Sequence, residues 1–218
     1  MIPKKYDAHD YDYPDFQIDQ VLSADNLNHS FAFNEQQERL TRTNLIGIGI
    51  LCGLKATKSA NGKVITITKG TGVTSQGYLI VHGNENSSAA IDYTRYRSFN
   101  AYQDIKYPPF ISGTTAKYAQ WELLTELEAK TTDPELTNAF LGDKVCVLFY
   151  EMLETDAKNC DTTSCDDKGK LIAITVRKLL MYTEDAKSLI DELNQKAHAS
   201  GSGETFPELP RNIHNGNC

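Results

Sequence analysis

The residues best suited to chemistry lie in one polar segment, residues 160–169. This segment holds two cysteines and three aspartates: Cys160, Asp161, Cys165, Asp166 and Asp167. Four residues separate the two thiols, so both sulfurs can reach one zinc ion, and a closed zinc site takes four ligands. Cys218, with His214 nearby, could complete the set. Residues 160–169 are therefore a candidate metal-binding segment.

The same pair, Cys160 and Cys165, fits two other arrangements. The cysteines could form a disulfide that tightens the loop in oxidising surroundings. They could also be two exposed thiols on a turn. The sequence leaves a structural metal, a disulfide and neither of these as open alternatives, and it predicts no other cofactor.

Three glycines, Gly47, Gly49 and Gly53, superficially suggest nucleotide binding. A dinucleotide-binding fingerprint places its glycines between a strand and a following helix. Here a predicted helix comes first and a hairpin follows, so these glycines indicate a structural role.

Catalytic groups are scattered along the chain. The five histidines show no local Ser-His-Asp or Cys-His pairing; they are His9, His29, His82, His198 and His214. Cys52 and Cys146 lie in apolar runs and are expected to be buried thiols, whose surroundings raise the thiol pKa. We predict that the protein is not an enzyme.

Charge and hydropathy exclude further classes of function. The formal net charge is −7, and lysine and arginine do not cluster, which argues against nucleic-acid binding. No run approaches the roughly 20 apolar residues of a membrane helix, so membrane insertion is not expected. Residues 1–10 lack the apolar stretch of a secretory signal, and we expect folding in the cytoplasm.

The first 22 residues are predicted to form an extended arm, which packs either on its own domain or on a neighbouring subunit. Ser23 can cap a helix over residues 24–43, in which Leu27 and Phe31 share one face. Aromatic and apolar side chains suit docking to another surface. The candidate assembly residues are Tyr11, Tyr13, Phe16, Leu27 and Phe31.

The next segment, residues 45–54, alternates branched apolar residues with glycines at period two, which predicts a strand. Glycine weakens a strand unless a neighbour fills the space, so Gly47 and Gly49 favour close packing by backbone or by the preceding helix. We expect this strand in the interior, with a bulge at Gly53.

The remaining elements predict an α+β fold, a β-rich body of antiparallel hairpins with an N-terminal helix, a central helix and a C-terminal helix. Asn61-Gly62 indicates a tight hairpin turn. The central helix is predicted over residues 116–130, with Trp121 as a core anchor. A long hairpin should pair residues 144–153 with 170–179. The last helix is predicted over residues 184–197, capped by Thr183.

This order of elements divides the chain into four parts. The predicted arm spans residues 1–22, and a helix and hairpin attachment module spans residues 23–97. An α+β module with the long hairpin spans residues 98–197. Residues 198–218 are rich in Gly, Ser, Pro and Asn and should form a flexible tail.

One long ordered string covers about the first third of the chain. It comprises Phe16-x-x-Asp19-x-Val21-Leu22-Ser23-x-x-x-Leu27-Asn28, then Gln37-x-Arg39-Leu40-Thr41-Arg42-x-x-Leu45-Ile46-Gly47-Ile48-Gly49-Ile50-x-Cys52-Gly53-Leu54, then Gly70-x-Gly72-Val73-Thr74-Ser75-x-Gly77-Tyr78-Leu79-Ile80. This string resembles the start of structural proteins of phage-tail-like contractile injection systems, of the Bacteroidetes type.

The resemblance implies a tail-fibre-like or baseplate-associated protein that attaches to the particle through its N-terminal region. Its implied partners are baseplate, tube or sheath proteins and further copies of itself, with a trimer as one expected form. The implied location is the cytoplasm during assembly, then a particle that is released or acts at the cell surface. No catalytic residue is carried over from the family.

Two other functions stay open at this point. A carbohydrate-binding or cell-surface-binding module would use exposed tyrosines and the Asp-rich segment to hold a glycan or calcium. A hydrolytic accessory enzyme would need a nucleophile that local spacing does not indicate. Assembly by protein-protein contact is the function that the sequence favours.

Overall fold

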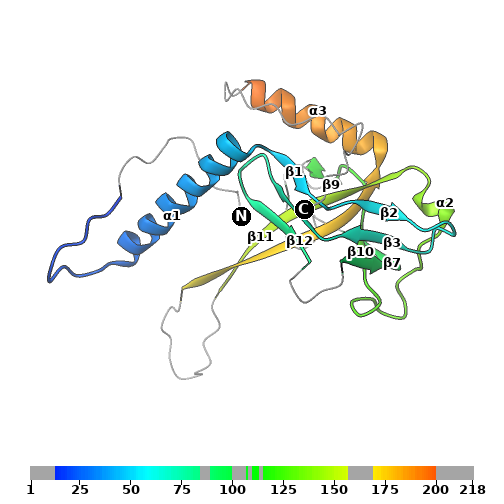
Figure 1. The fold of residues 1–218 in the computed structure, drawn as a ribbon, viewed down its shortest axis with the longest axis horizontal. Helices are drawn as coiled ribbons and strands as arrows, with labels where there is room; N and C mark the ends of the chain where they lie inside the picture. The colour runs from blue at the N-terminus through cyan, green and yellow to red at the C-terminus, as the bar shows by residue number, and fades with distance from the viewer. Residues whose placement is uncertain are drawn as a thin grey trace.

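The computed structural model describes residues 13–83, 89–99, 107, 110–112, 115–156 and 169–199. Helices lie at the start, centre and end of this chain, and antiparallel strands form the body between them (Figure 1). The predicted α+β class is therefore confirmed. The elements are α1 (Ala24–Thr41), η1 (Arg42–Ile46), β1 (Gly49–Cys52), β2 (Ala56–Lys58), β3 (Ile65–Thr68), β4 (Gly70–Val73), β5 (Leu79–His82), β6 (Ala90–Tyr93), β7 (Arg95–Ser98), β8 (Ile111–Ser112), β9 (Thr115–Ala116), β10 (Gln120–Leu124), α2 (Asn138–Leu141), β11 (Lys144–Asp156), β12 (Lys170–Tyr182) and α3 (Thr183–Ala199).

The strands form three main sheets and one short pair. One sheet has the order β1-β4-β5, a second has the order β2-β3-β6, and the largest has the order β11-β12-β10-β7. Strands β8 and β9 pair with each other. Every pairing between these strands is antiparallel, as the prediction of a hairpin-built body requires.

The N-terminal helix begins where the sequence predicts. The Ser23 hydroxyl accepts a hydrogen bond from the Asn26 backbone N–H at 3.2 Å, and Asp25 occupies the first turn. An N-cap of this kind contributes about 1 kcal/mol to helix stability. The helix ends at Thr41 and passes directly into η1, a five-residue π-helical turn, rather than ending at residue 43.

The predicted hairpin at Asn61-Gly62 is confirmed, with a longer loop than two residues. Strands β2 and β3 pair through Thr57 and Thr66. The Gly62 N–H donates to the Ser59 carbonyl at 2.9 Å, and the Ser59 N–H donates to the carbonyl of residue 64 at 2.9 Å. Gly62 has a φ of +69°, a conformation that glycine adopts without steric cost.

The long hairpin of β11 and β12 is also confirmed and dominates the molecule. Its two 13-residue strands pair continuously from Lys144 opposite Tyr182 to Asp156 opposite Lys170. The far end of this ribbon projects beyond the body (Figure 1). Helix α3 follows at once, and the Thr183 N–H and hydroxyl both donate to the Asp143 carbonyl, each at 3.0 Å.

The helix predicted over residues 116–130 is wrong. Gln120–Leu124 form strand β10, which lies between β12 and β7. The central helix is instead the short α2, capped by Thr137, whose hydroxyl accepts from the Phe140 N–H. Trp121 packs edge-on against Phe140 and Tyr182, with ring centroids 5.3 and 5.4 Å apart. Long-range strand pairing therefore overrides the helical spacing of local apolar residues.

Two clusters of buried apolar side chains form the core. One cluster joins Ile67 and Tyr93, from the predicted attachment module, to Leu123, Leu136 and Leu180, from the predicted second module. The second cluster packs α3 against β11 and β12 through residues that include Phe110, Tyr118, Met181, Ala186 and Leu189. The first cluster therefore draws its residues from both predicted modules.

No helix formed by the described residues combines the length and the apolar character needed to cross a membrane.

Candidate assembly surface

The segment before α1 folds back toward the helix. Its turn is closed by the Gln20 N–H, which donates to the Gln17 carbonyl at 3.2 Å, and Asp19 within it has a φ of +64°. The Tyr13 ring then meets the Phe33 ring of α1 at a centroid distance of 5.2 Å. Residues 13–22 and α1 thus form one extension that leaves the β body (Figure 1).

This extension exposes large apolar side chains. Ile18 is 93% exposed, Val21 is 87% exposed and Phe31 is 74% exposed. The only fully buried residues of α1 are the polar Gln36 and Arg39, and its apolar residues such as Phe33 and Leu40 are at most half-buried. We call the following exposed residues the N-terminal docking surface: Phe16, Ile18, Val21, Leu22, Leu27 and Phe31.

Four of the five predicted assembly residues are exposed in the structure. Tyr13, Phe16, Leu27 and Phe31 all present large parts of their side chains to solvent. Tyr11 lies outside the described residues. Exposure is what a docking role requires, and the role itself stays a prediction.

The C-terminal end of α1 joins this extension to the body. The Arg39 Nε donates to the Gln76 carbonyl, and the Arg39 guanidinium lies 4.3 Å from the centroid of the Tyr78 ring. Tyr78 stacks in turn on Tyr150 of β11, with centroids 4.9 Å apart. A cation-π contact of this kind contributes about 0.5–2 kcal/mol. One arginine and two stacked tyrosines therefore connect the helix to the long ribbon.

The segment predicted as a buried strand, residues 45–54, forms a strand only over Gly49–Cys52 and is largely at the surface, so the predicted burial is wrong. Leu45 lies in η1 and is 82% exposed, and Ile50 of β1 is about half exposed. No atom lies within 4 Å of a Cβ built at Gly47 or Gly49. These glycines are needed for their φ angles of +102° and +122°, which other residues rarely adopt, and not for close packing.

The predicted close approach occurs instead at Gly53. A Cβ there would lie 1.7 Å from the Lys69 carbonyl oxygen, so only glycine fits. The irregularity in the pairing of β1 with β4 falls between Ile50 and Cys52, just before Gly53. Leu54, the last residue of the segment, is buried. Only this end of the segment enters the interior.

Exposed apolar side chains also lie on the projecting part of the β11–β12 ribbon. Leu171, Ile172 and Ile174 of β12 are each more than half exposed. Ile172 and Ile174 share one face of the strand, and Leu171 lies on the other. The three residues lie opposite Thr155, Glu154 and Met152 of β11. The sequence correctly predicted the hairpin, and it gave no sign that this part extends past the core.

The cysteines and the possible metal-binding side chains do not gather at one place in the described part of the chain. Cys160 and Cys165 lie outside the described residues, and the described part of the chain contains no group of three or more His, Cys, Asp or Glu side chains placed to hold a metal. Cys146 is a free thiol, and burial raises its pKa to about 12. Cys52 is disulfide-bonded and half-buried, so the expectation of a buried thiol is wrong for this residue.

Comparison with known proteins does not assign the chain to a family. No protein-family model matches the chain, and no curated protein is significantly similar to it.

Proposed function

We propose that the protein is a structural component of a phage-tail-like contractile injection particle, a tail-fibre or baseplate-attached protein that acts by protein-protein assembly. The observation that supports this most is the N-terminal extension, in which no apolar side chain of α1 is fully buried and Leu27 and Phe31 are exposed. Its partners are baseplate, tube or sheath proteins and further copies of the chain.

The physical argument concerns apolar area left in water. Removing apolar surface from water is favourable by about 25 cal/mol per Å², so a set of large exposed side chains favours association. Leu27 and Phe31 stand four residues apart on one helix face, a spacing typical of the anchors of a helix that binds in a groove. The extension therefore suits docking to another protein.

The type of particle rests on the resemblance of residues 16–80 to structural proteins of such systems. Most of the N-terminal docking surface belongs to that string, including Phe16, Val21, Leu22 and Leu27. The resemblance and the exposure thus point to the same part of the chain. That part is the proposed attachment region.

A site-specific cross-link tests the proposal. A photoreactive phenylalanine analogue replaces Phe31 in cells that produce the particle, and the cross-linked products are identified by mass spectrometry. The proposal expects products with baseplate, tube or sheath proteins, or with a second copy of the chain. The matched control places the analogue at Leu127, which is 99% exposed in a turn of the body. Equal cross-linking at both positions, or none at Phe31, would contradict the proposal.

A further inference from the structure

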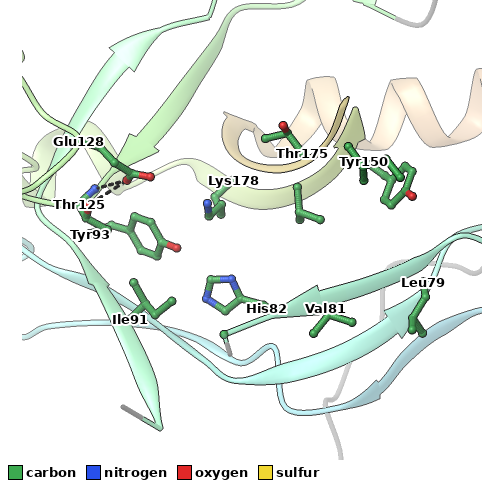
Figure 2. A pocket seen from close by; sticks show the side chains of 13 residues that line it. Leu79, Val81, His82, Ile91, Tyr93, Thr125, Glu128, Tyr150, Thr175 and Lys178 are labelled. Carbon is green, nitrogen blue, oxygen red and sulfur yellow. Dashed lines mark hydrogen bonds between the residues drawn. The ribbon is translucent and has the colours of Figure 1, made fainter. Parts of the chain in front are cut away.

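A groove lies between strand β5 and the β11–β12 ribbon (Figure 2). Its volume is about 600 Å³. One end is walled by apolar side chains and one aromatic ring; they are Leu79, Val81, Tyr150, Ile174 and Val176. This end can cover the apolar faces of a small ligand.

The other end of the groove carries one cation and one anion. The Glu128 carboxylate accepts hydrogen bonds from the Thr125 N–H and hydroxyl, both at 2.9 Å. Burial raises the pKa of Glu128, but the Thr125 hydrogen bonds and Lys178 outweigh it and hold that pKa below its usual value. The Lys178 ammonium lies 5.7 Å from the centroid of the Tyr93 ring. The two charges balance, so this end is polar without a net charge.

A buried histidine lies beside these charges. His82 is 5% exposed, and its Nε2 has no hydrogen-bond partner among the described residues. Its ring hydrogen-bonds the Ile67 backbone, and burial together with Lys178 lowers its pKa, so the ring is neutral near pH 7. A neutral imidazole that donates through one nitrogen accepts through the other. Nε2 is therefore an acceptor without a donor, a state that costs about 1–3 kcal/mol.

We propose that this groove binds a neutral, hydroxyl-rich ligand, which is the chemistry of a sugar. The opposite charges of Glu128 and Lys178 cancel, so a ligand with a net charge of either sign gains no overall attraction from this end of the groove. His82 offers an acceptor, which an anion without a proton to donate cannot use. A hydroxyl group both donates and accepts, so it satisfies a mixed set of donors and acceptors. The proposal does not depend on assembly into a particle.

The side chains that would hold the ligand converge on one space. In Figure 2 the Tyr93 hydroxyl, the Lys178 ammonium and the His82 ring point toward the same part of the groove. Lys178 donates to one ligand hydroxyl and Glu128 accepts from another, while the apolar side chains at the other end of the groove cover an apolar face of the ligand. Because Nε2 is itself buried, His82 receives a hydroxyl only after side chains of the groove wall shift.

The test is a titration of the full chain with three neutral disaccharides, lactose, cellobiose and N,N′-diacetylchitobiose, followed by amide chemical shifts. We expect saturable shifts at residues 79–82 and 174–178 with at least one sugar, with a Kd of about 1 mM, typical of a few hydrogen bonds in an open groove. Octanoate, an anion with an apolar chain, is the comparison ligand. Absence of saturation with all three sugars, or stronger binding of octanoate, would overturn the proposal.

Two variants locate the binding. Lys178→Met should weaken binding about tenfold, the loss of one hydrogen bond to a charged donor. Lys63→Met, in the β2–β3 loop away from the groove lining, should leave the Kd unchanged. Thermal unfolding of both variants shows whether they fold. Equal affinity of wild type and the folded Lys178→Met variant would also overturn the proposal.

Discussion

Gly77 passes so close to Arg39 that a Cβ at position 77 would lie 2.6 Å from the Arg39 carbonyl oxygen. Gly77 also has a φ of +81°, a conformation that favours glycine. This contact lies beside the cation-π contact of Arg39 with Tyr78, where α1 joins the body. The close packing where α1 joins the body therefore requires a glycine at position 77.

Gly77→Ala should destabilise the protein by about 1–2 kcal/mol, from the unfavourable φ and the contact with Arg39. Urea unfolding measures the change. Gly142→Ala is the matched control, because Gly142 has ordinary helical angles and a Cβ there would make only normal contacts at 3.6 Å and beyond. Equal losses in the two variants would show that the Gly77 contact has no special role.

Some elements could be predicted because their signals are local. Ser23 has a helix sequence after it, and the capping bond needs only the next three residues. The Asn61-Gly62 turn and the branched runs of β11 and β12 likewise carry their own strand and turn propensities. In each case neighbours in the sequence are also neighbours in space.

Other features depend on partners far along the chain. Trp121 has helical spacing to nearby apolar residues, but it is opposite Leu180 and Ser98 in a sheet that local spacing does not reveal. The strand pattern predicts close packing at Gly47 and Gly49, whereas their positive φ angles carry the backbone out of η1 at the surface. The groove around His82 likewise assembles residues from β5, β6, β11, β12 and the 125–128 turn.

An ion pair between the half-buried Arg177 and the buried Glu151 provides a second test of the fold. The Arg177 Nε donates to Glu151 at 2.6 Å, its Nη1 donates to Glu122 at 2.9 Å, and the Tyr107 hydroxyl also donates to Glu151. Arg177→Met leaves the Glu151 carboxylate, which is 3% exposed, without its cation. We expect a loss of about 2–4 kcal/mol in the free energy of unfolding.

The double variant Arg177→Met/Glu151→Leu should recover part of this loss, because it also removes the buried charge. Lys187→Met, which breaks an exposed pair with Glu184, is the control and should change stability by less than about 0.5 kcal/mol. A double variant that is no more stable than Arg177→Met would refute the charge argument.

Acid should weaken the contact of Asp133 with Arg97. The Arg97 Nε donates to the Asp133 carboxylate at 3.0 Å and the Lys130 N–H donates at 2.8 Å, and these bonds lower the pKa of Asp133 to about 2. A carboxylate with a lowered pKa stabilises the fold above its unfolded pKa of about 3.9, and this contribution disappears as pH falls toward 2.

Asp133→Asn should therefore be less stable than wild type at pH 7, and the difference should shrink between pH 4 and pH 2, around the two pKa values. Urea unfolding across this range measures it. Asp191→Asn, at an exposed position of α3, is the control, and its stability should differ little from that of wild type at any pH in this range. A constant deficit of Asp133→Asn down to pH 2 would contradict the argument.

The central claim is that the N-terminal docking surface attaches the chain to a particle, and co-sedimentation tests it most directly. Leu27→Gln/Phe31→Gln keeps good helix formers on α1 and should alter stability by less than about 1 kcal/mol. The account predicts that wild type and the control Leu127→Gln sediment with sheath, tube or baseplate proteins, while the double variant stays in the supernatant. A double variant that sediments like wild type, or a wild-type chain that never sediments with such particles, would contradict it.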